Sequence, residues 1–284
     1  MKVTVGVPTY NHGPYIRQAL QSIVDQVQDG FELEVLIFDD CSTDSTSEIC
    51  KEFENRYNFV KFMPSEVNLG LEGNGPRVFA NCKGNYIAFC DGDDYWTDKF
   101  KLVKQLRAFQ NNERISVVYH NVEINKNQVK VKNIYDNAQP EYISFDDLLG
   151  GQFMKTSAVM LKYTDNMFDP IVKRELPSDD TSLCFLALEN GGLGFFINEV
   201  MAVYRVHDKG VWSNIEERKK LEWSVRSLKR YIKYYLGKYD LKPLQNILTV
   251  TQGQLLMLSM KQLNIKRAES TAYDMLKVKM GQVE

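Results

Sequence analysis

The first half of the chain alternates short apolar runs with segments whose apolar residues recur at helical spacing. Apolar runs of strand length occupy 3–7, 33–38, 59–63 and 86–90, and such runs are typical of strands covered on both faces. Helical periodicity follows each run, at 15–27, around Ile49 and Phe53, at 76–82 and at 97–109. This alternation predicts an α/β fold with a parallel, doubly wound sheet. We expect Ser42 or Thr43 to cap the second helix and Thr97 the fourth.

The second half predicts a mixed arrangement. Strands are expected at 117–124, 129–134, 157–161 and 194–206, the first two forming a hairpin, with a helix at 181–189. From residue 214 onward the pattern is helical, and we expect Gly237 and Pro243 to divide it into two or three helices. The predicted organisation is a domain 1–213, with a nucleotide-binding half 1–96 and an acceptor half 97–213, followed by a helical region 214–284.

Composition narrows the functional classes. The 284 residues are 44% hydrophobic and 25% charged, as in soluble globular proteins. Lys and Arg number 35 and Asp and Glu 37, so no global basic field favours nucleic acid as a partner. The apolar runs are too short to span a bilayer, and no signal peptide is evident. Five cysteines without a C-x-x-C motif indicate reduced core residues and a cytoplasmic protein.

An acidic cluster, Asp91-Gly92-Asp93-Asp94, directly follows the apolar run 86–90. Open α/β sheets bind ligands at the carboxyl ends of their strands. Asp91 and Asp93 are one residue apart, so both can face one divalent cation that shares its remaining ligands with substrate phosphates. The alternative interpretation is an exposed acidic turn that caps the next helix.

Three further groups are candidates for binding or chemistry. Residues 39–44, Asp-Asp-Cys-Ser-Thr-Asp, follow another apolar run, where a carboxylate can accept a hydrogen bond from a base or ribose. Asp179 and Asp180 open the predicted helix at 181–189, where acids are also favoured simply as helix-terminal charges. His207 ends the last predicted strand and can complete a metal site, whereas His12 and His120 are interpreted as structural.

Common nucleotide-binding fingerprints and a hydrolase triad are not recognisable. Gly73-Asn74-Gly75 is followed by Val78 where a dinucleotide loop needs its third glycine. Gly70 and Gly75 have P-loop spacing, but Pro76-Arg77 replaces the required Lys-Ser/Thr. No Ser-His-Asp triad is legible.

Taken in order, these segments resemble the inverting glycosyltransferases of family 2, which have the GT-A fold, over about residues 1–210. Residues 39–44 resemble the family's D-D-x-S-x-D motif, and 91–94 its D-x-D-D motif. Residues 179–183 are similar to E-D-x-x-L, and 204–207 to Y-R-x-H. The first-strand motif is matched by 7–11, and 68–70 with Asn74 and Arg77 resembles a variant of the donor-site segment that lacks the commoner A-R-N triplet.

The resemblance implies a role for each matching residue. Asp180 would be the general base, while Asp93 and His207 would hold Mn²⁺ or Mg²⁺. Asp40 would read the uracil and Asp91 would contact the ribose. The implied nucleotide-sugar-binding residues are Pro8, Thr9, Tyr10, Asn11, Asp40, Asn68, Gly70, Asn74, Arg77, Asp91 and Gly92, and the implied acceptor-side residues are Trp96, Asp179 and Arg205.

The implied reaction moves a sugar from a nucleotide-diphosphate sugar to an acceptor hydroxyl with inversion. A UDP donor is expected, with dTDP as the near alternative. The expected acceptor is a saccharide or a lipid-linked saccharide, as in the assembly of cell-surface polysaccharide or glycolipid. Two other classes stay open: a non-catalytic carbohydrate-binding member of the family and a sugar-1-phosphate nucleotidylyltransferase. The latter would need a glycine-rich basic loop where Pro8-Thr9-Tyr10-Asn11 stands.

The helical region begins with a basic segment. Residues 214–242 carry nine Lys or Arg against four acids, with tyrosines and Trp223 interleaved. The favoured interpretation is an ordinary helix that packs on the catalytic domain and has a solvated basic face. The alternative is peripheral contact with the inner face of the membrane, because a basic aromatic helix can rest on an anionic lipid surface. The sequence does not indicate an oligomeric state.

Overall fold

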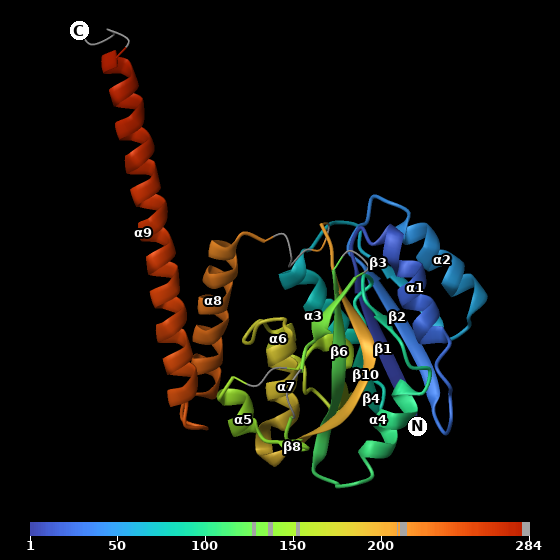
Figure 1. The fold of residues 1–284 in the computed structure, drawn as a ribbon. Coiled ribbons are helices and arrows are strands. Elements are labelled where there is room, and N and C mark those ends of the chain that lie inside the picture. The colour runs from blue at the N-terminus through green and yellow to red at the C-terminus, as the bar shows by residue number, and fades with distance from the viewer. Residues whose placement is uncertain (127–128, 136–138, 152–153, 209, 211–214, 280–284) are drawn as a thin grey trace. The chain divides into compact units, whose positions relative to one another are not determined.

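The computed structural model describes residues 1–279 apart from 127–128, 136–138, 152–153, 209 and 211–214, with side chains described as far as residue 261 (Figure 1). The chain divides into two compact units, residues 1–214 and 215–284. The expected domain boundary, between 213 and 214, falls in a stretch outside the described residues.

The first unit is built on one mixed sheet with the strand order β3-β2-β1-β4-β9-β6-β10-β5. The four apolar runs of the first half are parallel strands, as predicted. Their carboxyl ends therefore share one edge of the sheet. These strands are β1 (Lys2–Thr9), β2 (Glu32–Asp39), β3 (Val60–Pro64) and β4 (Tyr86–Phe89).

The remaining strands make the sheet mixed, which confirms the α/β fold class. The long strands β6 and β10 run parallel, and β9 lies antiparallel between β4 and β6. The expected hairpin at 117–134 is formed by β6 and β7, and its turn residues 127–128 lie outside the described residues. These strands are β5 (Tyr95–Trp96), β6 (Ile115–Lys126), β7 (Val129–Asn133), β8 (Tyr142–Ile143), β9 (Met160–Lys162) and β10 (Leu193–Val206).

The strand predicted at 157–161 begins only at Met160. Residues Thr156–Ala158 form a 3₁₀ turn instead. The carbonyl of Ser157 accepts from the indole of Trp96, and that of Ala158 accepts from the amide of Gln105. These carbonyls are thus bonded by side chains rather than by a neighbouring strand.

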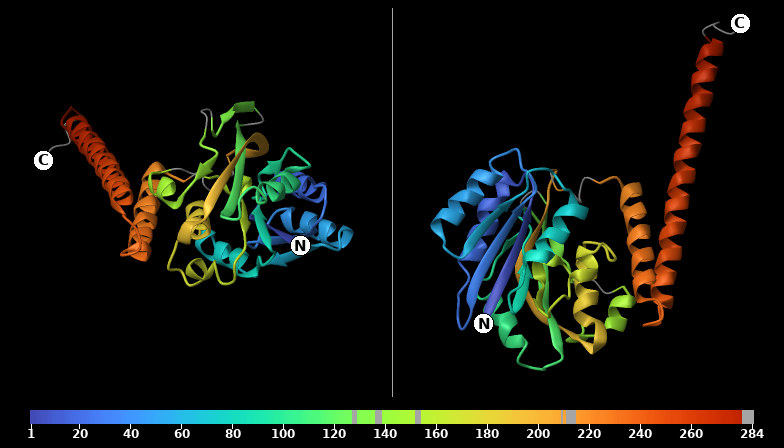
Figure 2. Two further views of the ribbon diagram at one scale, coloured as in Figure 1. Left: turned by 90° about the horizontal axis from the view of Figure 1, so that it is seen from below. Right: turned by 180° about the vertical axis from the view of Figure 1, so that it is seen from behind.

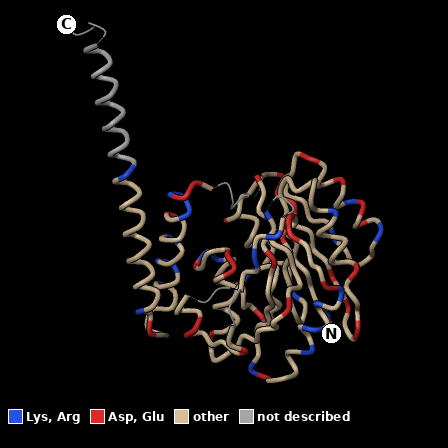
Figure 3. Tube along the Cα trace, in the orientation of Figure 1, with Lys and Arg blue, Asp and Glu red and all other residues tan. Residues whose placement is uncertain are grey.

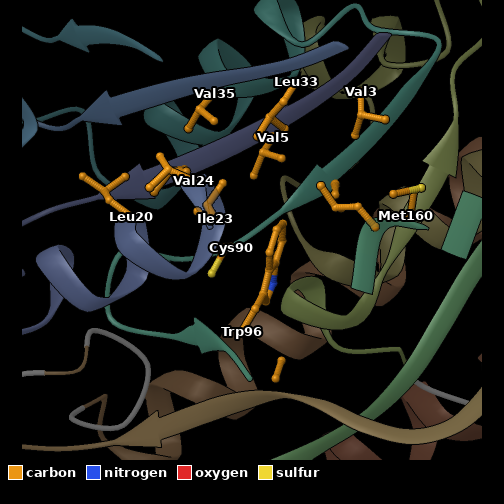
Figure 4. Packing of buried hydrophobic residues seen from close by; sticks show 14 of the residues in the cluster. Val3, Val5, Leu20, Ile23, Val24, Leu33, Val35, Cys90, Trp96 and Met160 are labelled. Atoms are coloured by element: carbon orange, nitrogen blue, oxygen red, sulfur yellow. The ribbon is translucent and has the colours of Figure 1, made fainter. Parts of the chain in front are cut away.

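Helices cover both faces of the sheet (Figures 1 and 2). One face carries α1, α2 and α4, and its core includes Val5, Ile23, Cys90 and Trp96 (Figure 4). The other face carries α3, α5, α6 and α7, where the rings of Phe79 and Phe168 meet. Their bounds are α1 (Gly13–Val24), α2 (Thr46–Arg56), α3 (Leu71–Asn81), α4 (Lys101–Ala108), α5 (Phe145–Leu149), α6 (Asp169–Val172) and α7 (Asp180–Leu188).

Three predicted helix starts are wrong. Helix α2 begins at Thr46, because Ser42 and Thr43 bond the loops after β1 and β2 rather than the helix. Helix α4 begins at Lys101 instead of following Thr97 directly. Helix α3 begins at Leu71 rather than Pro76, since the amides of residues 73 and 74 already donate to the carbonyl of Gly70.

Four of the five cysteines are buried and all are free, as expected, but Cys41 is only half-buried. It lies in the loop after β2 with a φ of 63°. Cys41 is therefore a loop residue rather than part of the core.

The second unit contains α8 (Glu217–Tyr235) and α9 (Lys242–Lys279), which lie side by side. Gly237 separates them with a φ of 79°. Pro243 is the second residue of α9, a position where proline does not interrupt a helix, so it does not add the expected break. None of the described helices is both long and apolar enough to cross a membrane.

Candidate active site

The candidate site lies where β1, β2 and β4 end. Because these strands are parallel neighbours, their carboxyl ends bring the loops at 9–12, 39–44 and 91–94 together. The amide of Gly92 donates to the carbonyl of Pro8, and that of Asp40 to the carbonyl of Thr9, each at 3.0 Å. Two of the acidic clusters found in the sequence therefore meet at the end of β1.

Gly92 allows the 91–94 turn to lie directly against β1. A Cβ at this position would come within 2.5 Å of Thr9 Oγ1 and 2.9 Å of His12 Nδ1. Those two atoms are themselves 3.2 Å apart. The turn thus needs glycine for close approach rather than for an unusual φ.

Two histidines converge on Asp93. His207 Nε2 lies 3.1 Å from Asp93 Oδ2, and His12 Nε2 lies 3.6 Å from the same oxygen. Burial opposes ionisation of Asp93, but the His207 hydrogen bond and the nearby His12 hold its pKa below the ordinary value. His12 Nε2 is buried without a hydrogen-bond partner in the described structure. His12 was interpreted as structural, and its place beside Asp93 corrects that interpretation.

The ionised forms of Asp91 and Asp94, the other carboxylates of the turn, are unfavourable. Burial, followed by the charge of Asp93, raises the pKa of Asp91 and of Asp94. Asp94 Oδ1 accepts from the amide of Arg205 at 2.9 Å. Asp94 Oδ2 has no partner among the described residues. Such a turn is favourable for a cation, because positive charge would relieve the repulsion between its carboxylates.

Asp93 and His207 are the residues beside each other that could contribute to a divalent metal site. Carboxylate oxygens suit Mn²⁺ and Mg²⁺, and a neutral imidazole is a common metal ligand. Within the described part of the chain, no group of three or more His, Cys, Asp or Glu side chains is arranged to hold a metal ion. Substrate phosphates would therefore have to supply further ligands, as is usual for Mg²⁺ and similar ions.

The paired acids at the start of α7 have different environments. Asp179 is the N-cap, and its carboxylate accepts from the amide of Ser182 at 2.8 Å. Asp180 instead accepts from the hydroxyl and the amide of Thr156, and lies 3.7 Å from the ammonium of Lys155. The helix start predicted at these acids is confirmed.

The loop after β1 is bonded to the loop after β2. The amide of Asn11 donates to Ser42 Oγ and its side-chain oxygen accepts from the amide of Thr43, each at 2.8 Å. Asn11 has a φ of 54°, a conformation that asparagine tolerates better than most residues. Tyr10 is half-buried next to it.

Asp40 is bonded to the predicted donor-site segment. Its two carboxylate oxygens accept from the amides of Leu69 and Gly70, both at 2.8 Å, and Asn68 also accepts from Gly70. Gly70 has a φ of 66° and a ψ of −179°, a region open essentially to glycine alone. Asp40 thus fixes this backbone segment at the edge of the site.

Asn74 and Arg77 bond the ends of β2 and β3. The Asn74 amide donates to the carbonyl of Phe38, and its oxygen accepts from Arg77. Arg77 donates to the carbonyls of Asp39, Met63 and Pro64. Both predicted donor-site residues therefore have structural bonds in this conformation.

Arg205 and Trp96 have packing roles in the structure. The Arg205 guanidinium donates to the carbonyl of Asp93 and to Gln18, and lies 4.3 Å from the Tyr95 ring centroid. Trp96 is 4% exposed and is part of the hydrophobic core (Figure 4). These contacts hold the 91–94 turn against its surroundings. Because its ring is buried, Trp96 is a core residue rather than the expected acceptor-side residue.

Three site residues were missed or misread by the sequence analysis: His12, Lys155 and Thr156. A histidine just after the first strand carried a usable signal, because that strand end lies at the ligand-binding edge. Lys155 and Thr156 lie far from any motif, and only the fold brings them to Asp180. His120, by contrast, is fully buried and bonds the carbonyl of Asn121 at 2.7 Å, as expected of a structural residue.

Comparison with known protein families shows to which family the chain belongs. Residues 4–166 match the sequence model of glycosyl transferase family 2. The chain belongs to this family. Family membership argues against a nucleotidylyltransferase, the alternative with a related sheet.

Two relatives match this chain over more than three quarters of its length. An uncharacterized protein of Mycobacterium tuberculosis is 33% identical over 223 residues, which are 77% of this chain and 62% of that protein. This chain thus spans about three fifths of that relative's length. The putative teichuronic acid biosynthesis glycosyltransferase TuaG of Bacillus subtilis is 28% identical over 226 residues, 78% of this chain and 86% of TuaG.

Solved structures show the same GT-A fold. Residues 1–349 of S. aureus TarS in complex with UDP-GlcNAc superpose with a TM-score of 0.63 at 19% identity, covering 89% of this chain and 72% of that one. The mannosyltransferase PcManGT from Pyrobaculum calidifontis, in complex with GDP-Man and Mn²⁺, gives a TM-score of 0.59 at 16% identity, covering 99% and 83%. At these identities the likeness shows the fold alone.

Proposed function

We propose that this protein transfers a sugar from a UDP-sugar to an acceptor hydroxyl with inversion at the anomeric carbon. The observation that supports this most is the arrangement of acids on either side of Asp91. Asp93, with His207, adjoins it in the turn, and the charge of Asp180 acts on it from α7. A donor diphosphate and an attacking hydroxyl need such separate groups within one site.

In the proposed step, the acceptor oxygen attacks the anomeric carbon while the bond from that carbon to the diphosphate oxygen breaks. Asp180 accepts the proton of the acceptor hydroxyl, and the leaving diphosphate takes the bonding electron pair. Positioned bases of this kind contribute about 10²–10⁴ in rate. Asp93 and His207 would hold Mn²⁺ or Mg²⁺, which when bound offsets the negative charge of the leaving group. Displacement on an α-linked donor gives a β-linked product.

The donor base is proposed to lie along the loops after β1 and β2. The residues proposed to line it are Pro8, Thr9, Tyr10 and Asn11, with Asp40, Asn68, Gly70, Asn74, Arg77, Asp91 and Gly92 completing the donor side. A uridine donor is supported by the TarS complex with UDP-GlcNAc, and thymidine has the same N3–H. The GDP-Man complex of PcManGT represents the competing choice.

The acceptor is proposed to be a saccharide or lipid-linked saccharide of a cell-surface polymer. The name of TuaG, which refers to teichuronic acid biosynthesis, supports this class. Asp179 and Arg205 remain the proposed acceptor-side residues. A cytoplasmic enzyme at the inner face of the membrane would suit such an acceptor, and the basic segment 214–242 is the proposed point of contact.

Nucleotide binding tests the donor proposal. We expect isothermal calorimetry to show that UDP binds more tightly than GDP and that Mn²⁺ strengthens UDP binding. GDP affinity tenfold above that of UDP, a difference of about 1.4 kcal/mol, would contradict the uridine assignment.

The metal proposal is tested by Asp93→Ala. We expect this variant to lose the Mn²⁺ enhancement of UDP binding and the hydrolysis of UDP-sugars, while binding of UDP without metal stays nearly unchanged. A variant with full hydrolytic activity in excess EDTA would show that Asp93 does not act through a metal.

Inversion is tested separately. The anomeric configuration of a transferred product, determined by NMR, should be opposite to that of the donor.

A further inference from the structure

Among the contacts described for the Asp180 carboxylate, Lys155 is the residue that carries a positive charge. Its ammonium lies 3.7 Å from Asp180 Oδ2, and its side chain is 18% exposed. It also lies 4.2 Å from the ring centroid of Tyr204. Desolvating an ammonium this far is unfavourable unless opposite charges compensate. The neighbouring carboxylates therefore account for its position.

Lys155 stays charged in this environment. Burial lowers its pKa, but Asp180, Tyr204, Asp91 and Asp94 together raise it above the ordinary lysine value. Lys101 provides the contrast within the same unit. It is fully buried with Gln105 as its hydrogen-bond partner, and burial lowers its pKa to about 7. Carboxylates, rather than burial as such, distinguish Lys155.

Two consecutive residues, Lys155 and Thr156, contact the two carboxylate oxygens of Asp180. The amide of Thr156 donates to Oδ2 at 3.2 Å, its hydroxyl donates to Oδ1, and Lys155 adds its charge at Oδ2. The turn at Thr156–Ala158 is itself fixed by Trp96 and Gln105. A rigid segment of the sheet region thus sets where the carboxylate of α7 points.

We propose that Lys155 is a positioning residue for sugar transfer, which orients the carboxylate of Asp180 toward the acceptor hydroxyl. This inference rests on the proposed function, in which Asp180 is the general base. The attraction of the ammonium, together with the two Thr156 donors, fixes the direction of the Asp180 carboxylate. The charges of Asp91 and Asp94 act on the same ammonium.

The groups around Asp180 come from several elements. Lys155 and Thr156 precede β9, Asp91 follows β4, and Asp179 caps the same helix. The charge of Asp180 also contributes to raising the pKa of the Tyr135 hydroxyl and of the Cys184 thiol. Lys155 supplies the positive charge in this set, so its removal leaves the Thr156 donors as the remaining described contacts that orient Asp180.

The test compares Lys155→Met, Lys155→Gln and Lys155→Arg with Asp180→Asn. The rate measured is hydrolysis of the UDP-sugar that the native protein hydrolyses fastest, with Mn²⁺ present and with kcat and KM determined separately. We expect Lys155→Met and Lys155→Gln to lower kcat by about 10-fold or more while UDP affinity and the KM of the donor are retained, because the ammonium contacts Asp180. Lys155→Arg should recover most of the lost rate.

A double variant distinguishes positioning from general structural support. If Lys155 acts through Asp180, adding Lys155→Met to Asp180→Asn should cause little further loss of rate, because coupled residues are non-additive. Lys101→Met is the matched control for removing a buried lysine, and it should leave kcat and KM unchanged. Melting curves establish folding, and Lys155→Gln or Lys155→Arg replaces Lys155→Met in the cycle if that variant does not fold.

The outcomes separate the two proposals. An Asp180→Asn variant with native rate would refute Asp180 as the base, and with it the mechanism on which this inference rests. If Asp180→Asn is slow but the Lys155 variants keep the native rate, or if their losses simply multiply in the double variant, the role of Lys155 is refuted alone. Loss of kcat with an unchanged KM, rescue by arginine and non-additivity would support it.

Discussion

Aspartates adjacent in the sequence of this protein have different partners in the structure. Asp93 is next to two histidines, whereas Asp94 accepts from the amide of Arg205. Asp179 caps its helix, whereas Asp180 faces Thr156 and Lys155. The sequence predicted that each cluster is important, from its place after a buried strand or at a helix start. It could not assign a separate role to each acid of a pair, because the partners that distinguish Asp180 and Asp93 lie 24 and 114 residues away.

The two acids of α7 should respond differently to the same substitution. Asp180→Asn keeps the shape of the side chain but cannot accept a proton, so we expect kcat to fall by about 10²-fold or more with UDP affinity retained. Asp179→Asn keeps a good N-cap and should cost much less rate. Steady-state transfer or donor hydrolysis, with melting curves, measures both. Equal modest losses would mean that both acids are only helix-terminal charges.

Lys101 gives a prediction for the pH dependence of stability. Its ammonium is fully buried against Trp96 and Gln105, and burial lowers its pKa to about 7. Below pH 7 the lysine is protonated in both the folded and the unfolded states, and the folded protein bears the full cost of the buried charge. Between pH 7 and the ordinary lysine value near 10.5, only the unfolded chain binds the proton. The free energy of unfolding should therefore rise with pH in this window.

Lys101→Met removes this contribution. We expect the variant to be more stable than the native protein at pH 6–7, and its advantage to shrink by about 1 kcal/mol per pH unit as pH rises toward 10. Urea unfolding of both proteins across this range gives the difference, in which the titration of other groups cancels. A difference that does not depend on pH would contradict a lowered lysine pKa.

Among the elements, most strands were predictable, whereas the starts of α2, α3 and α4 were not. The apolar runs at 3–7 and 33–38 became β1 and β2, because a run of that length is buried on both faces of a parallel sheet. Ser42 and Thr43 have good capping side chains, yet both form hydrogen bonds with Asn11 in the loop after β1. Tertiary bonds thus override local capping preference. The same holds for residues 156–158, where side chains of Trp96 and Gln105 replace a strand neighbour.

The 91–94 turn depends on glycine at one position. In Gly92→Ala the new Cβ would approach Thr9 Oγ1 to 2.5 Å and His12 Nδ1 to 2.9 Å. We expect a loss of about 1–3 kcal/mol in unfolding free energy and weaker Mn²⁺-dependent UDP binding, because the turn that carries Asp93 must move. Chemical unfolding and calorimetry measure the two effects.

Gly253→Ala is the matched control for this substitution. Gly253 lies in α9, and a Cβ there would meet nothing within 4 Å. Alanine is a better helix former by about 1 kcal/mol, so stability should rise or stay the same and UDP binding should not change. A Gly92→Ala variant that behaves like this control would show that the turn has room for a side chain.

For the whole molecule, the order of motifs along the chain predicted the GT-A fold of the first unit. The mixed half of the sheet and the helical character of the second unit were also predicted. Contacts such as the one between Lys155 and Asp180 were not, because they require β9 and α7 to be placed first. The family match covers residues 4–166, so the helices from Glu217 onward lie outside it and their role has to be argued from their own residues.

Helix α8 exposes several basic side chains, whereas two of its tyrosines are buried. Tyr231 and Tyr235 are buried, and Lys238 lies 4.4 Å from the ring centroid of Tyr234. Basic positions recur along the helix (Figure 3), and the exposed ones among them are Arg218, Lys219, Arg226, Lys229 and Lys233. A membrane contact through α8 would thus use charge more than inserted aromatic rings.

We therefore predict weak, salt-sensitive binding to anionic membranes. Each Lys or Arg near an anionic surface contributes about 1 kcal/mol, and ionic strength screens this attraction. The full chain should sediment with vesicles containing about 30% phosphatidylserine at low salt, and it should be released by about 0.5 M NaCl. Replacing Lys229 and Lys233 by Glu should abolish sedimentation without changing UDP binding, and neutral phosphatidylcholine vesicles serve as the control. Sedimentation that persists in high salt would indicate inserted apolar residues, and none at low salt would leave α8 with an ordinary solvated basic face.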